Sequence, residues 1–521
     1  MKAVDSATMR DIDRFAVKDF AMKGLQLMEN AGRAVAVFIG KEFFPAGFDK
    51  KRDLSVALVA GKGNNGGDAF VAARHLENMG IGADVFCLAA PGDYKGDAAI
   101  NKKIWLEMGG ELYPILTKKD LKKHDSRLLH SSIIVDAIFG TGLNSEVKGI
   151  HAEVIEFINA TGAKVVSIDV PSGIDASTGQ VLGTAVKAFA TVTMALPKTG
   201  FFQFPGSLHA GRVEVADIGV PRELLVDEGI QWNITDPAYL RRVLKARERD
   251  SHKGTYGHVA VLSGSPGKTG AVFMAAAASM RAGAGLVTIG LPETLAPIMA
   301  AKTTEVMTHA LPETADKTLG AESYDQVKAL LSGKSAVVTG PGLGISAGVL
   351  RFMEKLLRGE CPPLVIDADG LTVLAGHLSV VKESGKEIVL TPHPGEAARL
   401  LGVSVEDVQG DRFGAATELS ETSGAVVVLK GAYTVIAGKK GVCYINPTGN
   451  PGLATAGTGD VLAGMIGGFL AQGHKPLEAA VTAAYIHGLA ADRVAEVSGE
   501  AGMTATDLLG HIPAVRNSFI S

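Results

Sequence analysis

Four oxygen-bearing side chains in the first half of the chain stand directly after short apolar runs or close behind them. They are Asn65, Asp68, Asp136 and Asp169. A carboxylate in such a position can act as a general acid or base, and amide and carboxylate oxygens can bind a monovalent cation or a polar, sugar-like ligand. Because the carboxyl ends of parallel strands lie on one edge of a sheet, we expect their loops to converge on one crevice.

Glycines surround these side chains and leave a second interpretation open. The segment Gly61-x-Gly63-x-x-Gly66, with Asp84 about twenty residues further on, has the spacing of a dinucleotide-binding loop. An ordinary hydride-transfer site is disfavoured, because Asp68 in the following helix would compete with a pyrophosphate for the positive helix end. Each aspartate taken alone could instead cap a turn or a helix.

A second candidate site lies near the end of the chain, where residues 450–459 lead into an apolar helix. Small residues let a phosphate approach the backbone amides, and the helix start adds its positive dipole end. Asp460 could take a proton from a hydroxyl that attacks phosphate, or it could only cap the helix. The segment 264–269 looks like a P-loop, but Leu262 stands where that motif needs glycine.

The apolar runs that position these side chains are short and continuous, which indicates strands buried on both faces of a parallel sheet. In the first half they follow a helical segment from residue 3 to about 44, and lie at 54–60, 84–88, 133–135, 165–168, 192–195 and 212–215. In the second half they lie at 258–262, 286–289, 336–339, 364–366, 388–390 and 426–429, before helices at 460–471 and 476–497. The alternation predicts two three-layer α/β/α domains, residues 1–228 and residues 229–521.

Composition narrows the class of protein. The formal net charge of −4 over 521 residues argues against a protein that coats nucleic acid. The hydrophobic fraction of 46% excludes a mostly disordered chain. Three distant cysteines exclude a disulfide framework and predict a cytoplasmic protein. The uncharged apolar stretches are shorter than the roughly 20 residues of a membrane helix, so neither nucleic acid nor membrane is an expected partner.

Four motifs in the first 225 residues together resemble the NAD(P)H-hydrate epimerase family, which has a Rossmann-like fold. In chain order they are Leu27-Met28-Glu29-Asn30-Ala31-Gly32, Gly63-Asn64-Asn65-Gly66-Gly67-Asp68, Asp136-x-x-x-Gly140-Thr141-Gly142 and Asp169-Val170-Pro171-Ser172-Gly173. The resemblance implies interconversion of the R and S hydrates of NADH and NADPH beside a bound potassium ion.

The same resemblance implies roles for individual residues. Asn65, Asp136 and Ser172 would bind potassium, and Asp169 would be the catalytic acid or base. The substrate-binding residues would be Asn64, Asn65, Gly66, Gly67, Asp68, Gly140, Thr141, Gly142, Leu143, Asn144, Ser145, Glu146 and Asp169.

Residues 235–521 resemble the ADP-dependent NAD(P)H-hydrate dehydratase, a member of the ribokinase-like superfamily. The motifs are Gly254-Thr255-Tyr256-Gly257-His258, Gly270-Ala271, Gly340-Pro341-Gly342-Leu343-Gly344, Thr391-Pro392-His393-Pro394-Gly395-Glu396, Leu429-Lys430-Gly431-Ala432 and Ala456-Gly457-Thr458-Gly459-Asp460. The resemblance implies that Ala271, Gly342, His393 and Asp460 face the hydrate, with Asp460 as the base. The ADP-binding residues would be Lys430, Gly431, Ala432, Tyr433, Thr434, Asn450, Pro451, Gly452, Leu453, Ala454, Thr455, Ala456, Gly457, Thr458 and Gly459.

The two resemblances together imply a bifunctional isomerase and lyase that repairs nicotinamide nucleotides. Both hydrate epimers would be equilibrated by the first domain, and the second would dehydrate the S form with ADP and magnesium, giving AMP and phosphate. We expect a homo-oligomer. The alternatives are a ribokinase-like small-metabolite kinase fused to a nucleotide-binding module, and a first domain reused only for binding.

Overall fold

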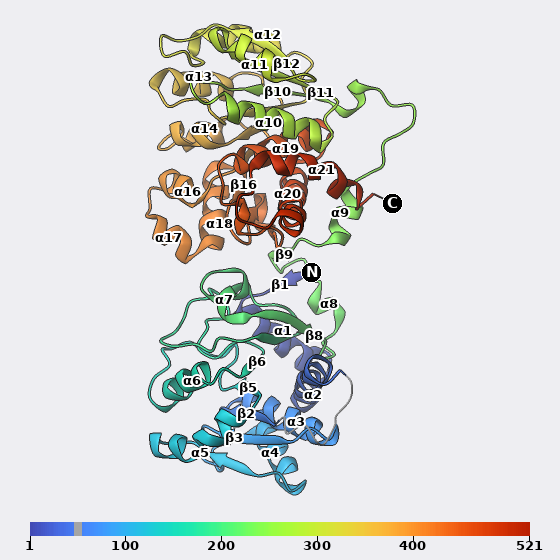
Figure 1. Ribbon diagram of the computed structural model, residues 1–521, viewed down its shortest axis with the longest axis vertical. Coiled ribbons are helices and arrows are strands. Elements are labelled where there is room, and N and C mark those ends of the chain that lie inside the picture. The colour runs from blue at the N-terminus through green and yellow to red at the C-terminus, as the bar shows by residue number, and fades with distance from the viewer. Residues whose placement is uncertain (46–54, 521) are drawn as a thin grey trace. The chain divides into compact units, whose positions relative to one another are not determined.

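The computed structural model describes residues 1–45 and 55–520 (Figure 1). The chain forms two compact units, Lys2–Trp232 and Asn233–Ser521, the latter together with Met1. Two short strands mark the limits of the N-terminal unit in the sequence: β1 (Lys2–Ala3) at its start and β9 (Trp232–Ile234) at its end. The predicted class of two three-layer α/β folds is confirmed by the layers described below.

The N-terminal unit is built on a seven-stranded sheet in which every neighbouring pair is parallel. The strand order is β4-β3-β2-β5-β6-β7-β8. The strands are β2 (Val56–Ala60), β3 (Ala83–Cys87), β4 (Leu112–Pro114), β5 (Ile133–Ala137), β6 (Lys164–Ile168), β7 (Ala190–Met194) and β8 (Arg212–Ala216). The helices are α1 (Ser6–Asp19), α2 (Gly24–Phe43), α3 (Asn64–Asn78), α4 (Gly96–Glu107), α5 (Lys118–His130), α6 (Ile150–Ala160), α7 (Gly206–Ala210) and α8 (Arg222–Leu225).

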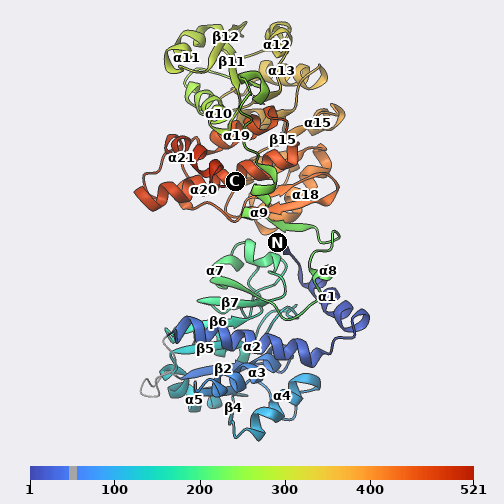
Figure 2. The same cartoon turned by 90° about the vertical axis from the view of Figure 1, so that its right-hand side faces the viewer.

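Both faces of this sheet are buried under helices. Val56 and Leu58 of β2 pack with the apolar residues of α2 and α3, and Figure 2 shows α2 running across that face. Ala57 and Val59 point the other way and pack with α5 and α6. The alternation explains why β2 reads as a continuous apolar run.

The single helical segment predicted from residue 3 to about 44 is wrong in one respect. The structure has two helices there, because α1 ends at Asp19 and α2 begins at Gly24. Ala21 between them has a left-handed backbone (φ 53°), which cannot continue a right-handed helix. The break separates α1 from α2 and leaves α1 free to form a wall of the site described below.

The C-terminal unit contains a larger mixed sheet. Its strands run in the order β18-β17-β16-β15-β14-β13-β10-β11-β12, parallel from β16 to β12 and antiparallel at β17 and β18. They are β10 (His258–Leu262), β11 (Leu286–Pro292), β12 (Met307–Leu311), β13 (Ala336–Thr339), β14 (Leu364–Ile366), β15 (Ile388–Leu390), β16 (Val426–Leu429), β17 (Val435–Ala437) and β18 (Cys443–Ile445).

Helices again cover both faces of that sheet. One layer contains α10 (Thr269–Ala282), α19 (Thr458–Ala471), α20 (Pro476–Ser498) and α21 (Ala505–Asn517), whose apolar residues form one core with β10 and β13. Figure 1 shows α13 (Ala347–Arg358), α16 (Pro394–Leu401) and α18 (Arg412–Ser423) together, and Figure 2 shows α13 and α18 on the side opposite to α20 and α21. The remaining helices are α9 (Pro237–Val243), α11 (Ala296–Lys302), α12 (Tyr324–Leu331), α14 (Ala368–Val373), α15 (Leu378–Glu383) and α17 (Val405–Gly410). A search of the described helices finds none with the length and apolar character of a membrane span.

Candidate active sites

The first site is a cavity of about 1330 Å³ in the N-terminal unit. It opens where the strand order reverses, since the chain passes from β2 outward to β3 and from β5 outward on the other side to β6. Open α/β sheets bind ligands at such a switch point, beyond the carboxyl ends of the strands. The loops after β2, β5 and β6 line the cavity together with α1 and the start of α2.

Most of the predicted substrate-binding residues line this cavity. They are Asn64, Asn65, Asp68, Gly140, Thr141, Gly142, Leu143, Asn144, Ser145 and Asp169. Gly66 and Gly67 lie in the first turns of α3 behind the cavity wall, where a Cβ on Gly66 would lie 1.8 Å from the Gly61 carbonyl oxygen. Glu146 is exposed and pairs with Lys148 at 2.8 Å.

The three predicted potassium ligands meet around one backbone carbonyl, that of Phe139. Asn65 Nδ2 donates to this carbonyl at 2.9 Å, and Ser172 Oγ lies 3.2 Å from it. Ser172 Oγ also donates to Asp136 at 2.5 Å, and the Ser172 backbone N–H does so at 2.8 Å. Asp136 is fully buried, and this burial raises the pKa of its carboxyl although the Ser172 hydrogen bonds lower it.

Asp169 is held at the cavity wall by a lysine that the sequence motifs did not indicate. Lys198 Nζ donates to Asp169 Oδ1 at 2.5 Å, to Thr193 Oγ1 at 2.9 Å and to the Met194 carbonyl at 3.0 Å. Lys198 is 0% exposed, so the ion pair is formed in a largely water-excluded place. Asp169 has a left-handed backbone (φ 64°), an unfavourable conformation of the kind that often marks functional sites.

Two further carboxylates share this end of the cavity with Asp169. Burial raises the pKa of Asp68 well above its usual value, and the charges of Asp169 and Asp13 add to the rise. Burial and the Asp169 charge raise the pKa of Asp13 to about 6. The cluster Asp13, Asp68 and Asp169 therefore lies beside the buried cation Lys198. Asp13 comes from α1, outside every motif, so only the fold could reveal it.

The second site is formed by the loops that follow β10, β13, β14, β15 and β16 in the C-terminal unit. The strand order reverses here too, between β10 and β13. α19 begins at this edge after Gly457, whose left-handed backbone (φ 93°) turns the chain into the helix. Asp460 stands in the first turn of α19. Burial and the neighbouring Asp367 charge raise the pKa of Asp460 to about 7, while Lys430 lowers it.

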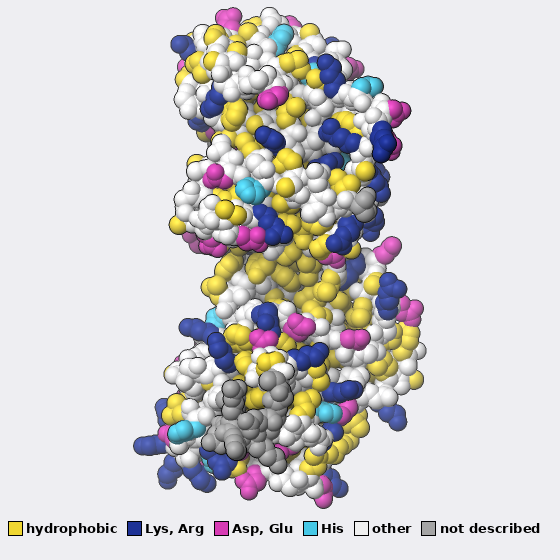
Figure 3. Space-filling view, turned by 45° about the vertical axis from the view of Figure 1, so that its right-hand side comes forward, with side chains coloured by type: hydrophobic (Ala, Val, Ile, Leu, Met, Phe, Trp, Pro, Cys, Tyr) yellow, Lys and Arg dark blue, Asp and Glu magenta, His cyan; other side chains and the backbone are white. Residues whose placement is uncertain are grey.

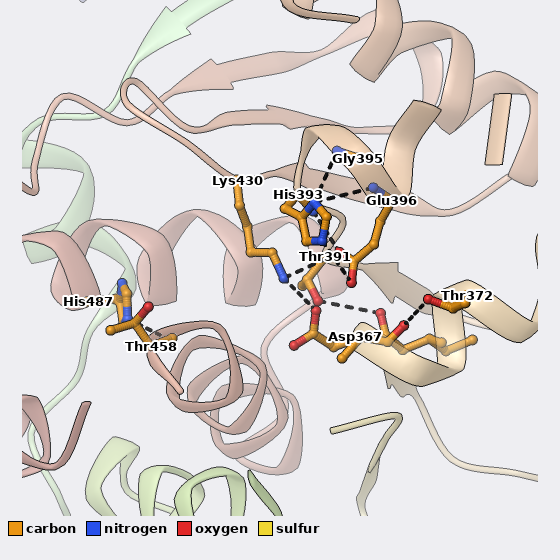
Figure 4. Close-up of polar contacts among 11 residues, drawn as sticks. Asp367, Thr372, Thr391, His393, Gly395, Glu396, Lys430, Thr458 and His487 are labelled. Carbon is orange, nitrogen blue, oxygen red and sulfur yellow. Dashed lines mark hydrogen bonds and ion pairs between the residues drawn. The ribbon is translucent and has the colours of Figure 1, made fainter. Parts of the chain in front are cut away.

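Lys430 joins three of the loops. Figure 4 shows its side chain extending toward two carboxylates, with Nζ 2.7 Å from Asp367 Oδ1 and 3.7 Å from Glu396 Oε2. Burial lowers the pKa of Lys430, but these two carboxylates raise it overall. A Cβ on Gly459 would lie 3.3 Å from Lys430 Nζ, so the lysine lies beside the start of α19 and next to Asp460.

His393 begins α16 and is held by that helix. Its ring Nδ1 accepts hydrogen bonds from the backbone N–H groups of Gly395 at 3.0 Å and Glu396 at 3.3 Å, while the backbone N–H of His393 donates to Glu396 Oε2 at 2.8 Å (Figure 4). Because Nδ1 is an acceptor here, Nε2 carries the proton of the neutral ring. Half of the side chain, 51%, is exposed, so the ring also faces solvent beside the Lys430 cluster.

The remaining predicted hydrate contacts lie near a second ion pair. Gly342 follows β13, and a Cβ on it would lie 3.4 Å from the Ala271 side chain of α10. Lys268 Nζ, just before α10, lies 2.8 Å from Asp369 Oδ2, which also accepts from the Gly344 N–H at 2.8 Å. Asp367 and Asp369, which follow β14, thus hold one lysine each.

The predicted ADP-binding residues form two loops. Gly431, Ala432, Tyr433 and Thr434 make the turn between β16 and β17, where Thr434 Oγ1 donates to the Gly431 carbonyl at 2.9 Å. Asn450 begins the second loop and donates to Asp492 of α20 at 3.0 Å. The rest of that loop is Pro451, Gly452, Leu453, Ala454, Thr455, Ala456, Gly457, Thr458 and Gly459, which leads directly into α19.

A buried histidine fixes the end of this second loop. His487 of α20 lies 2.9 Å from the Thr458 carbonyl through Nε2 (Figure 4). Burial lowers the pKa of His487 to about 4, so the ring is neutral near pH 7 and Nε2 donates. His487 lies in the middle of an apolar helix, and the sequence there did not predict this contact.

The charged side chains on the face drawn in Figure 3 are of both signs and interspersed. Lys and Arg side chains are more frequent along one edge of the C-terminal unit in this view.

Two family models match the chain. One, described as YjeF-related protein N-terminus, matches residues 24–200, and the other, NAD(P)H-hydrate dehydratase, matches residues 259–514. Among solved structures, an ADP/ATP-dependent NAD(P)H-hydrate dehydratase from Bacillus subtilis, co-crystallized with ATP and Mg²⁺, is 32% identical with a TM-score of 0.48. It covers 55% of this chain and 98% of its own.

Relatives of known name match nearly the whole length. The bifunctional NAD(P)H-hydrate repair enzyme of Moorella thermoacetica is 43% identical over 99% of this chain and 96% of its own length. The enzyme of the same name from Thermofilum pendens is 38% identical over 100% of this chain and 98% of its own length. The chain therefore belongs to the family of bifunctional NAD(P)H-hydrate repair enzymes.

Proposed function

We propose that the N-terminal unit interconverts the R and S hydrates of NADH and NADPH, and that the C-terminal unit dehydrates the S hydrate with ADP. We assign the first activity to residues 1–228 and the second to residues 229–521. The observation that carries the proposal is the pair of acidic sites, one in each unit, at the switch points of the two sheets. Full-length relatives with this name favour it over the small-metabolite kinase.

Epimerisation requires that a hydroxyl on a ring carbon beside nitrogen leave and return on the other face, or that the ring open and close. Either route needs a positioned proton donor and acceptor. Asp169 faces the cavity while Lys198 Nζ holds its Oδ1. We assign the proton transfer to Asp169, with Lys198 keeping its carboxylate oriented and charge-balanced as the hydroxyl proton is moved.

The residues around the Phe139 carbonyl fit a potassium ion. Their carboxylate, hydroxyl, amide and carbonyl oxygens form the donor set that hard cations prefer. The buried Asp136 carboxylate supplies a negative charge, and its pKa is raised by the same burial that a cation would offset. Asn65, Asp136 and Ser172 would hold the ion, which when bound would order the loops after β2, β5 and β6.

Dehydration needs a better leaving group than hydroxide. Asp460 would take the proton of the hydrate's hydroxyl, whose oxygen then bonds to the terminal phosphorus of ADP as the bond to AMP breaks. The lone pair of the ring nitrogen would expel phosphate, and loss of a neighbouring ring proton would give NAD(P)H. Lys430 lies beside Asp460 and would stabilise the phosphoryl oxygens.

The two glycine-containing loops at 430–434 and 450–459 would bind ADP, with Lys430 and the backbone amides at the start of α19 facing its phosphates. Ala271, Gly342 and His393 would contact the hydrate. Magnesium is expected on the nucleotide phosphates, where it would shield their charge. The cytoplasmic location and the homo-oligomeric state stay predictions from the sequence.

One assay tests the function. The purified protein receives mixed R and S NADPH hydrates with ADP, magnesium and potassium, and the recovery of NADPH absorbance is followed. Full recovery, faster than the spontaneous epimerisation of the R form, supports both activities. Recovery of the S fraction alone would contradict the epimerase assignment, and no recovery would contradict the whole proposal. ATP in place of ADP, with production of a phosphorylated alcohol, would support the kinase instead.

A further inference from the structure

A row of basic side chains on α1 lines the cavity of the N-terminal unit. Arg10, Arg14 and Lys18 are spaced at i, i+4 and i+8, so they lie above one another on one face of the helix. All three line the cavity and all three are exposed. The row is about 12 Å long at 1.5 Å per residue, which makes it longer than a nicotinamide ring needs.

Apart from Asp13, which α1 also carries, and Lys62 in the loop after β2, the exposed basic side chains and the buried carboxylates occupy different parts of the cavity wall. The carboxylates Asp68 and Asp169 lie at the buried end beside Lys198, with exposed fractions of 8% and 14%. The α1 row is at the open side, where Arg14 is 63% exposed. Arg14 pairs with Asp11 at 2.9 Å, but an exposed pair of this kind contributes little and can exchange for another anion.

A substrate with one polar ring and several phosphates would match this distribution. The ring end belongs with the buried acids, because the carboxylate of Asp169 would repel a phosphate placed beside it. The phosphates would then lie at the mouth of the cavity, and the basic row is the part of the wall that can neutralise them. Asp93 and Asp97 line another part of the wall and would disfavour phosphates there.

We propose that Arg10, Arg14 and Lys18 bind the phosphate groups of the dinucleotide hydrate in the epimerase site. The inference rests on the proposed function of that unit and adds a binding surface outside the glycine-rich loops. The phosphates can be the pyrophosphate, present in NADH and NADPH hydrates, or the 2′-phosphate, present only in NADPH hydrate. A row that bound no phosphate would be an ordinary solvated helix face. The experiment below distinguishes binding of the pyrophosphate, binding of the 2′-phosphate and no binding.

The test compares three full-length proteins: wild type, the variant Arg10→Gln, Arg14→Gln, Lys18→Gln, and a matched control. Glutamine keeps the helix propensity of α1 while it removes the charges. The control, Lys119→Gln, Lys122→Gln, Lys123→Gln, removes the same charge from exposed positions of α5 that do not line the cavity. The KM for epimerisation of R-NADPH hydrate and R-NADH hydrate is measured for each, and dehydration of the S hydrate serves as an internal reference.

We expect the α1 variant to raise the KM for R-NADPH hydrate by at least about tenfold, while the control stays within about twofold. A larger increase for the NADPH than for the NADH hydrate assigns the row to the 2′-phosphate, and equal increases assign it to the pyrophosphate. Both support the proposal. An unchanged KM for both hydrates would overturn it.

A binding measurement keeps this result separate from the proposed function. NADPH, NADH and reduced nicotinamide mononucleotide are titrated into the same proteins by calorimetry. If wild type does not epimerise, the function is wrong, and the row is judged by binding alone. Weaker binding of NADPH to the α1 variant than to wild type and the control supports the row, and a parallel loss for the mononucleotide, which carries one phosphate of the pyrophosphate, assigns it to the pyrophosphate. Equal NADPH affinity in all three proteins refutes it.

Discussion

The two sites use the same parts in different ways. Each lies at the switch point of its sheet, between parallel strands, and each has a largely buried lysine beside an aspartate: Lys198 with Asp169, and Lys430 with Asp367. In the N-terminal unit the lysine holds the aspartate that we assign to proton transfer. In the C-terminal unit Lys430 is paired with Asp367, which is a neighbour of the proposed base Asp460. Asp460 itself has a pKa raised to about 7.

The difference follows from the chemistry that we propose for each unit. An epimerase moves a proton within one enclosed ligand, so its carboxylate is held in one orientation by a buried cation. The dehydratase base must accept a proton near neutral pH and release it with the products, which a pKa near 7 allows. A lysine–aspartate pair thus positions the catalytic Asp169 in the N-terminal site. In the C-terminal site a pair of the same kind influences the pKa of the neighbouring Asp460.

The largest effect is expected from removal of the N-terminal lysine. Lys198→Met keeps the buried volume but removes the cation that holds Asp169, so epimerisation should fall by about 10²–10³-fold while dehydration of the S hydrate is unchanged. Separate assays of the two activities check this. Lys187→Met, an exposed change in the same unit, is the control. Undiminished epimerisation in a folded Lys198→Met protein would show that the pair is structural.

Lys198 and Asp13 are two residues of the N-terminal site that the sequence did not predict. The loops after β5 and β6 were expected to converge on one crevice, and the family resemblance named Asp136 and Ser172 together. The structure places these two side chains in a direct hydrogen bond. Lys198 follows β7 without a motif, and Asp13 comes from a helix outside the sheet. No local pattern reveals that such residues reach the crevice, because only the tertiary path of the chain brings them there.

The fold was predicted best where strands are buried on both faces. β2 is a continuous apolar run, β5 begins with one at 133–135, and both strands were predicted. β12, with the sequence Met-Thr-His-Ala-Leu, lies at the sheet edge and is mostly exposed, so its composition carries no clear strand signal. β17 and β18 are three-residue strands, which are too short to show the alternation of apolar and polar residues that predicts a strand.

A change in pH dependence should sharpen the comparison in the C-terminal unit. If Asp460 must be ionised to act, kcat/KM for dehydration rises with pH and levels off above about 7. The Asp367 charge raises the pKa of Asp460, and Lys430 lowers it, so Asp367→Asn should move the rising limb to lower pH. The pH–rate profile of Asp325→Asn, an exposed position on α12, should match wild type. A limb that stays in place or moves upward in Asp367→Asn would contradict the assignment.

The smallest effect is expected on stability. Burial raises the pKa of Asp13 to about 6 from an ordinary value of 3.8, so the folded state binds the proton more tightly than the unfolded state. Its contribution to stability is therefore lost as pH rises from about 4 through about 6. Asp13→Asn should raise the unfolding temperature above pH 6, by about 2–4 °C for each kcal/mol gained, and give no such gain at pH 4.

Scanning calorimetry at the two pH values measures this shift, with the exposed Asp11→Asn on the same helix as the control. An equal change at both pH values would mean that the charge of Asp13 is not the cause.

The central claim is that two separate acids serve two separate reactions, and reciprocal variants test it most directly. Asp169→Asn and Asp460→Asn proteins are each given mixed R and S NADPH hydrates with ADP, and chromatography follows both epimers and NADPH. We expect Asp169→Asn to consume the S hydrate and leave R to its spontaneous rate, and Asp460→Asn to equilibrate the epimers without forming NADPH. Loss of both reactions in either folded variant, or retention of both, would contradict the account.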